Sequence, residues 1–316
     1  MTVSEVDCLS TQGIAKDNLY SYLSDVLLNK DIELHERFRA LFTLKNIGGQ
    51  RSIEIIGQGF DDESALLKHE LAYVLGQMKD KAAIPILISV LDNVQEEPMV
   101  RHEAAEALGA IGDESSLCIL EKYKNDPEKC VSETCEIAID NIKFETLRNK
   151  GISSEGQSSF SSIDPAPSLA TKSLEELECL YLDDSRPLFE RYRAMFGLRN
   201  EGSERAVEIL AKGFGDKSEL FRHEVAYVFG QMQHPASVPA LIKVLDDKNE
   251  VGMVRHECAE ALGSIATKEC YDVLKAYSND SNRVVRESCL VALDMYEHEN
   301  SGEFQYANGV NNFNDN

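Results

Sequence analysis

Basic residues are few in this sequence. Lysine and arginine number 32 against 55 acidic residues, which gives the 316-residue chain a formal net charge of -23. Nucleic-acid binding depends on clustered basic side chains that neutralise phosphates, so this balance argues against a nucleic-acid partner. The charge suits a basic partner, because long-range attraction raises the rate of encounter, although solubility alone would also explain the acidity.

Long apolar runs and secretory features are also missing. No apolar stretch reaches the ~18–20 residues that a membrane-spanning helix needs. The N-terminus has no basic segment followed by an apolar run. The eight cysteines are scattered, and the closest pair, Cys130 and Cys135, lacks the C-x2-C spacing of a zinc site. We therefore expect no membrane attachment, reduced thiols and a cytoplasmic location.

Most of the chain is present twice. The segment KHELAYVLGQM at 68–78 recurs as RHEVAYVFGQM at 222–232. The segment PMVRHEAAEALGAI at 98–111 recurs as GMVRHECAEALGSI at 252–265. Both recurrences are offset by 154 residues. Internal repeats of this kind indicate a fold built from two similar halves.

A shorter period of 33 residues lies inside each half, where it separates His69 from His102 and His223 from His256. This period is typical of solenoids built from helix pairs, in which each repeat packs mainly on its neighbours. Apolar residues recur at helical spacing, and no alternating strand pattern of useful length occurs. The sequence therefore predicts an all-α fold of helical-hairpin repeats, in two pseudo-symmetric halves of about four repeats each.

The expected boundaries of the halves are 1–148 and 174–299. Residues 149–173 lie between them, are rich in Ser, Gly and Pro, and show no apolar period. This composition predicts a flexible linker. Residues 300–316 are polar and are expected to form a disordered tail.

Four of the seven histidines occupy one position of the repeat, and a glutamate follows each of them. The flanking repeats have other residues at this position, so an architectural role does not explain the histidines. Glycine lies two helical turns after each histidine, although it costs about 1 kcal/mol relative to alanine inside a helix. Such glycines let neighbouring helix backbones come close or leave space above them. The four dipeptides are His69–Glu70, His102–Glu103, His223–Glu224 and His256–Glu257.

The repeated dipeptides predict a metal site. Adjacent helices pack about 8–10 Å apart, so equivalent histidines on neighbouring repeats can converge on one ion. Two imidazoles and a carboxylate form a ligand set that leaves open positions for oxygen and is typical of non-haem iron. Any single pair is more simply a solvated helix face, but four in register favour ligands. If the two halves face each other across a central site, two metal ions would lie about 3.5–4 Å apart.

These residues resemble the deoxyhypusine hydroxylase family, which are HEAT-repeat di-iron monooxygenases. The family hydroxylates the deoxyhypusine side chain of translation initiation factor 5A. The resemblance extends from about Leu34 to Glu297 and includes all four His–Glu pairs. It implies a HEAT-like fold, two Fe²⁺ ions, O2 as co-substrate and an electron donor that is not identified. Because one chain supplies both halves of the site, a monomer is expected.

The resemblance also implies a division of roles, which the sequence alone does not provide. One iron would be held by His69, His102 and Glu103. The other iron would be held by His223, His256 and Glu257. The two remaining glutamates, Glu70 and Glu224, would hold the cationic arm of the substrate.

Two other classes of function stay open at this point. A metal-free HEAT-repeat adaptor would bind proteins on its concave face. A zinc hydrolase would use the same ligands, because histidine and glutamate without cysteine also bind zinc. The related HEAT-like bilin lyases share the repeat but not the fourfold His–Glu signature.

Overall fold

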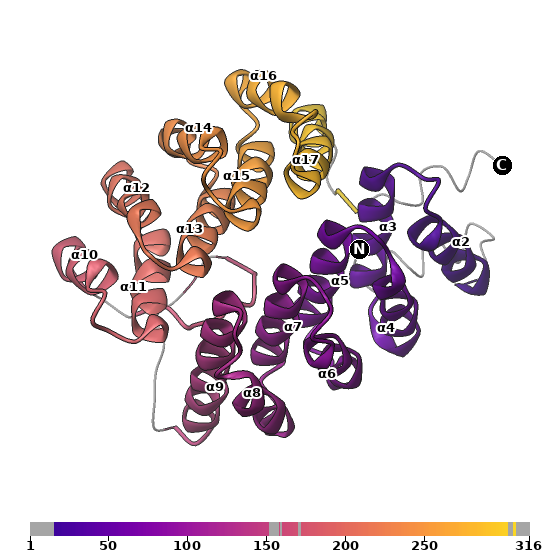
Figure 1. Ribbon diagram of the computed structural model, residues 1–316, viewed down its shortest axis with the longest axis horizontal. Coiled ribbons are helices and arrows are strands. Elements are labelled where there is room, and N and C mark those ends of the chain that lie inside the picture. The colour runs from indigo at the N-terminus through magenta and orange to yellow at the C-terminus, as the bar shows by residue number, and fades with distance from the viewer. Residues whose placement is uncertain (1–15, 152–157, 159, 170–171, 303–305, 308–316) are drawn as a thin grey trace.

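The computed structural model describes residues 16–151, 158, 160–169, 172–302 and 306–307. Within these ranges the chain forms 16 α-helices and no β-strand. The helices form a ring of two layers, in which odd-numbered helices from α3 onward lie inside and even-numbered helices lie outside (Figure 1). The two ends of the ring meet, because α17 contacts α3 and α5.

The inner helices are α3 (Leu34–Ile47), α5 (Ala65–Gln77), α7 (Pro98–Ile111), α9 (Lys129–Asn149), α11 (Leu188–Glu201), α13 (Glu219–Met232), α15 (Gly252–Ile265) and α17 (Arg283–Ser301). The outer helices are α2 (Lys16–Leu28), α4 (Gly49–Gln58), α6 (Ile84–Asp92), α8 (Leu117–Tyr123), α10 (Leu174–Leu182), α12 (Glu204–Ala211), α14 (Val238–Asp246) and α16 (Lys268–Tyr277). Five short 3₁₀ helices are η1 (Gly59–Asp61), η2 (Lys81–Ala83), η3 (Glu114–Ser116), η4 (Lys212–Gly215) and η5 (Pro235–Ser237).

Each outer helix and the inner helix that follows it form one hairpin, so each half contains four hairpins. The predicted all-α repeat fold with two similar halves is therefore confirmed. The His–Glu dipeptides lie on α5, α7, α13 and α15, which are the inner helices of the two central hairpins of each half. Within the described ranges, no helix combines the length and apolar character needed to cross a bilayer.

Close packing of the inner helices depends on the glycines that the sequence pattern singled out. A Cβ atom added to Gly76 of α5 would lie 2.8 Å from the Cα of Ala107 on α7. One added to Gly109 of α7 would lie 2.8 Å from the Cβ of Ala138 on α9. Real Cβ contacts are longer than this, so the glycines allow neighbouring backbones to approach. The close approach keeps the histidines of adjacent helices near each other.

Serine caps connect the His-bearing helices to the opposite half. Ser64 accepts a hydrogen bond from the Leu67 amide as the N-cap of α5, and its hydroxyl donates to Glu287 of α17 at 2.7 Å. Ser218 caps α13 in the same way and donates to Glu133 of α9 at 2.6 Å. Caps of this kind stabilise a helix by about 1 kcal/mol. Here they also fix the position of the first turn, directly before the histidine, which is the fifth residue of each helix.

Ring closure differs between the two junctions. Between α3 and α17, the Arg39 guanidinium donates two hydrogen bonds to Asp294, at 2.8 and 3.0 Å. At the other junction Arg193, which corresponds to Arg39, donates to the carbonyl of Pro167 at 3.0 Å. The arginine therefore forms an ion pair at the first junction, whereas at the second its counterpart donates to the segment between the halves and lies over the ring of Phe144.

The segment between the halves makes contacts that its composition did not predict. Gln77 and Ile163 exchange two hydrogen bonds of 2.9 Å, and the Asp164 carboxylate accepts from Arg199 at 2.6 and 2.8 Å. Residues 160–169 therefore contact α5 of one half and α11 of the other. The predicted linker otherwise falls partly on residues 152–157, 159 and 170–171, which lie outside the described residues. The boundaries of the halves stay a prediction.

The predicted tail begins inside α17, which continues to Ser301. Tyr306 packs edge-on against Phe42 at a centroid distance of 5.9 Å, and Ala307 is buried. The remainder of the expected disordered tail, 303–305 and 308–316, lies outside the described residues.

Candidate metal centre

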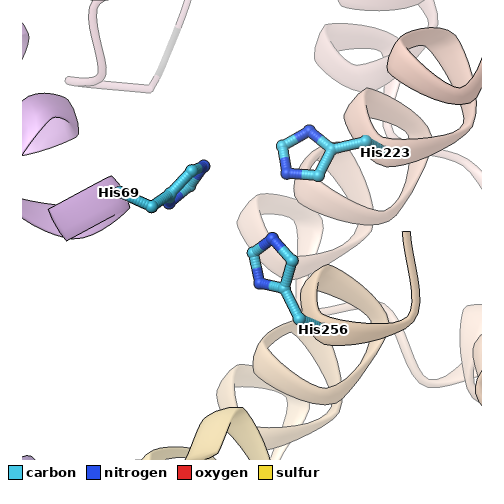
Figure 2. Close-up of side chains that lie close together, drawn as sticks. All are labelled: His69, His223 and His256. Carbon is cyan, nitrogen blue, oxygen red and sulfur yellow. The ribbon is translucent and has the colours of Figure 1, made fainter. Parts of the chain in front are cut away.

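Four imidazole rings meet between the two halves. His69 of α5 faces His223 of α13 and His256 of α15 across the space that separates them (Figure 2). His102 of α7 completes the group, and the ring centroids of five of the six pairs lie 5.2–5.9 Å apart. Side chains that are up to 187 residues apart in the sequence therefore share one small space.

The ring nitrogens in this cluster have no hydrogen-bond partner within the described part of the chain. This holds for both nitrogens of all four histidines, and each atom is buried. His102 and His256 are fully buried, and His69 and His223 are 5% exposed. Buried polar atoms are satisfied in the great majority of cases, so eight unsatisfied nitrogens in one place need a cause. Ligation of a metal ion would satisfy one nitrogen of each ring.

Two carboxylates lie against the histidines. Oε2 of Glu103 is 3.2 Å from Nε2 of His69, and Oε2 of Glu257 is 3.4 Å from Nε2 of His223. Both distances suit an ion pair, but neither contact has the direction of a hydrogen bond. Each carboxylate therefore comes from the helix next to that of the histidine it approaches.

Among the described residues, three groups of side chains are compact enough to bind an ion, with ligand atoms within 4.8 Å of one another. One group is the first predicted ligand set, His69, His102 and Glu103. The residues of the second predicted set are divided between two groups. These are His69 with His223 and His256, and His256 with Glu257 and Glu260. All six predicted ligands are thus in the cluster, and their assignment to two separate ions stays a prediction.

Burial sets the protonation of the histidines. Burial and the charge of His223 lower the pKa of His69 to about 4. Burial also lowers the pKa values of His102 and His256 well below the usual range. In His223 burial acts in the same direction, but Glu257 and Glu103 outweigh it and the pKa is raised. Three of the four rings are therefore neutral near pH 7, which is the form that binds metals.

Burial has the opposite effect on the carboxyl groups. It raises the pKa of Glu103 to about 8, and neighbouring carboxylates, led by Glu257, add to this effect. Carboxylates this close repel one another and do not all ionise without a cation between them. A bound cation would remove this obstacle, so the donor set fits a positively charged metal centre.

The two predicted substrate carboxylates line a cavity of about 630 Å³, whose wall also includes His69 and His223 of the histidine cluster. Glu70 is 7% exposed and Glu224 is 2% exposed. The cavity wall also contains Tyr73 and Tyr227, whose hydroxyls lie 3.2 Å apart and join the halves. From their helical spacing in the sequence alone, both tyrosines would be assigned to core packing. Glu70 and Glu224 are thus placed beside the cluster, although no ligand identifies their role.

Two further acidic residues of the site were not predicted. Glu106 and Glu260 line the same cavity and lie four residues after His102 and His256, one helical turn further along the same face. Glu260 lies 3.5 Å from Nδ1 of His256. The signal was the pattern His-Glu-x-x-Glu, present in both halves. It resembles an ordinary solvated helix face, which is why the spacing alone did not reveal it.

Comparisons with known proteins agree with this architecture. HEAT repeats match residues 53–140 and 207–294, which are offset by the same 154 residues as the duplicated motifs. Deoxyhypusine hydroxylase of Drosophila melanogaster is 56% identical over 289 residues, which cover 91% of this chain and 95% of that protein. The Homo sapiens enzyme is 54% identical over 288 residues, covering 91% and 94%.

A solved structure supports the same relationship. The structure of human deoxyhypusine hydroxylase in complex with glycerol superposes with a TM-score of 0.84 at 53% identity, covering 88% of this chain and 96% of that one. This similarity confirms the predicted hydroxylase over the metal-free adaptor. The chain belongs to the deoxyhypusine hydroxylase family of HEAT-repeat proteins.

Proposed function

We propose that this hydroxylase is a non-haem di-iron enzyme that uses O2 to convert the deoxyhypusine residue of translation initiation factor 5A into hypusine. The observation that carries the proposal is the set of eight buried ring nitrogens without hydrogen-bond partners among the described residues, contributed equally by the two halves. Hydrogen bonding or apolar packing would be the ordinary fate of a buried imidazole. If the cluster had only a structural role, all eight buried ring nitrogens would stay without a partner, which is energetically costly.

In this proposal His69, His102 and Glu103 hold one iron, and the symmetric residues His223, His256 and Glu257 hold the other. Two imidazoles and one carboxylate for each ion match the ligand set of oxygen-activating iron sites. When bound, the iron pair supplies the electrons and open coordination positions that dioxygen activation needs. One oxygen atom enters a carbon–hydrogen bond and the other leaves as water, with two electrons from an external donor and two protons.

The protein's own residues bind and orient the substrate. Deoxyhypusine is a lysine that carries an aminobutyl group, so its arm is cationic and thin. The cavity of about 630 Å³ has room for such an arm beside the cluster. Its wall provides the carboxylates of Glu70 and Glu224 to bind ammonium groups and the apolar rings of Phe38 and Phe42 to exclude water.

The test is incubation of the purified, iron-loaded protein with translation factor that carries deoxyhypusine, in air and with a chemical reductant. Mass spectrometry should detect the gain of one oxygen atom on the modified peptide, and ¹⁸O2 should supply that atom. Elemental analysis should find about two irons per chain. Label from water instead of O2, or zinc as the functional metal, would refute the proposal in favour of a hydrolytic site.

A control separates the metal centre from general loss of structure. His35→Ala removes a histidine that does not line the cavity and should retain metal and activity. His69→Ala should lose both without unfolding. The electron donor, the cytoplasmic location and the monomeric state stay predictions, and sedimentation of the iron-loaded protein would test the last of these.

A further inference from the structure

The cavity contains two pairs of carboxylates, and each pair joins the two halves. Glu70 and Glu260 lie within electrostatic reach of each other, and so do Glu224 and Glu106. All four residues line the same cavity. The pseudo-symmetry exchanges Glu70 with Glu224 and Glu106 with Glu260, so the pairs are equivalent by sequence position.

Other side chains of the protein already interact with both carboxylates of the Glu70–Glu260 pair. The Lys45 ammonium lies within electrostatic reach of the Glu70 carboxylate and 5.8 Å from the ring centroid of Tyr73. The hydroxyl of Ser288 donates to Oε1 of Glu260 at 3.1 Å. This pair therefore has a cation and a hydrogen-bond donor from the protein itself.

The Glu106–Glu224 pair lacks the equivalents of both contacts, and the charge that favours ionisation of Glu106 comes from His223, a proposed metal ligand. Arg199, which corresponds to Lys45, is instead bound by Asp164 at 2.6 Å. Thr134, which corresponds to Ser288, donates instead to the Cys130 carbonyl of its own helix at 2.8 Å.

The carboxylates of this pair are left without partners. Glu106 makes no hydrogen bond or ion pair with another residue in the described ranges. Oε1 of Glu224 is buried and has no hydrogen-bond partner there either, and the residue is only 2% exposed. Two neighbouring carboxylates without hydrogen-bond donors from the protein are costly to keep ionised in a largely buried site, so the site favours a ligand that brings a positive charge.

We propose that Glu106 and Glu224 together bind the terminal ammonium group of the substrate arm, so that the arm enters this nearly symmetric cavity in one direction only. Three ammonium N–H groups match the acceptor oxygens of two carboxylates. Glu106 is thereby a substrate-binding residue, and Lys45 disfavours the terminal ammonium at the equivalent position on the other side. The identity of the bound arm depends on the proposed function. The existence of a cation site depends only on the residues that line the cavity.

The duplication provides matched variants. Glu106→Gln and Glu260→Gln make the same change at equivalent positions, and each is measured in the iron-loaded protein. Glu106→Gln should raise KM for the deoxyhypusine-bearing factor at least about 10-fold, the loss expected when one partner of a charge-assisted hydrogen bond is removed. Glu260→Gln should change KM less than about threefold. Iron content should stay at the wild-type level in Glu106→Gln.

A second pair of variants repeats the comparison, so that the test does not depend on the folding of a single variant. Glu224→Gln and Glu70→Gln should repeat the contrast, with the larger rise of KM in Glu224→Gln. Equal effects within both pairs, or larger effects of Glu260→Gln and Glu70→Gln, would overturn the proposal. So would loss of iron from Glu106→Gln, because Glu106 would then be a metal ligand and not a substrate-binding residue.

Binding of n-butylammonium, measured by calorimetry, tests the cation site without turnover. The wild-type protein should bind one molecule, and Glu106→Gln should bind it at least about 10-fold more weakly. Lys45→Met should open the Glu70–Glu260 pair and raise the number of binding sites from one to two. An unchanged number would refute the role of Lys45. If the wild-type protein fails to hydroxylate deoxyhypusine but keeps this binding contrast, the proposed function fails and the cation site stands.

Discussion

The N-terminal and C-terminal halves have the same His–Glu dipeptides at the same positions and surround them with different contacts. Lys45 of the first half lies beside Tyr73 and influences Glu70, whereas its counterpart Arg199 is bound by Asp164. Comparing equivalent positions distinguishes residues that are the same in both halves from residues that differ. The proposed metal ligands and the cavity carboxylates are retained in both halves, whereas residues that contact these carboxylates differ.

This difference has a physical consequence for an unsymmetrical ligand. Two identical halves would bind the arm of deoxyhypusine equally well in two opposite orientations, and only one of these would present the right carbon to the metal centre. A difference of about 1.4 kcal/mol between the orientations already favours one of them 10-fold. An asymmetric arrangement of charges around a symmetric metal centre therefore increases the productive fraction of complexes.

Removing equivalent metal ligands from the two halves is expected to have the largest effect. His102→Ala and His256→Ala should each lower the hydroxylation rate at least about 100-fold, because both irons are needed together and direct ligands matter more than their supporting residues. Iron content should fall from about two per chain to one or fewer. Similar losses are expected from both variants; full activity of either one would remove that histidine from the proposed ligand set.

Matched glycine variants test packing in the two halves. A Cβ added to Gly76 would lie 2.8 Å from the Cα of Ala107, whereas one added to the equivalent Gly230 would lie 3.3 Å from the Cα of Ala261. Gly76→Ala should lower the free energy of unfolding by about 1–3 kcal/mol through overpacking. Gly230→Ala should change it little, because helix propensity recovers about 1 kcal/mol. Urea unfolding of both variants measures the contrast, and equal values would contradict the difference in packing.

The sequence predicts the periodic parts of the molecule well. The 33-residue and 154-residue periods predict the hairpins and the two halves, and the four His–Glu pairs are conspicuous because flanking repeats lack them. The environment of Glu106 and Glu260 is not predictable in this way, since a glutamate one turn after a histidine is common on exposed helices. The different fates of Lys45 and Arg199 depend on Asp164, which lies in a segment without periodicity.

Arginine variants at the two ring junctions should produce a smaller contrast. Arg39 makes two hydrogen bonds to Asp294, and the two side chains are 20% and 13% exposed. Arg39→Met should lower the free energy of unfolding by about 1–2 kcal/mol, since the pair is only partly shielded from water. The equivalent Arg193→Met loses a bond to the Pro167 carbonyl and should cost about 1 kcal/mol or less.

A double-mutant cycle provides the control for this junction. Asp294→Asn should destabilise the protein about as much as Arg39→Met, and the double variant should be no less stable than the worse single variant. Full additivity of the two losses would show that the pair does not act as a unit.

Protonation of the two equivalent histidines is the subtlest difference between the halves. In the metal-free protein, burial and the charge of His223 lower the pKa of His69 to about 4. Burial acts on His223 in the same direction, but Glu257 and Glu103 outweigh it, so its pKa is raised. NMR titration of the ring protons should show His223 retaining its proton above pH 6.5 and His69 staying neutral until about pH 4.

The contributions of these two histidines to stability have opposite signs. The raised pKa of His223 stabilises the folded protein below pH 6.5, and this contribution is lost as the pH rises through the folded-state pKa. The lowered pKa of His69 stabilises above pH 6.5, and this is lost as the pH falls towards about 4. Glu257→Gln should lower the pKa of His223, because it removes the carboxylate that most favours the protonated ring. If both rings of the unmutated protein instead titrate together near pH 6.5, the two halves provide equal electrostatic environments. This result would contradict the predicted difference between His69 and His223.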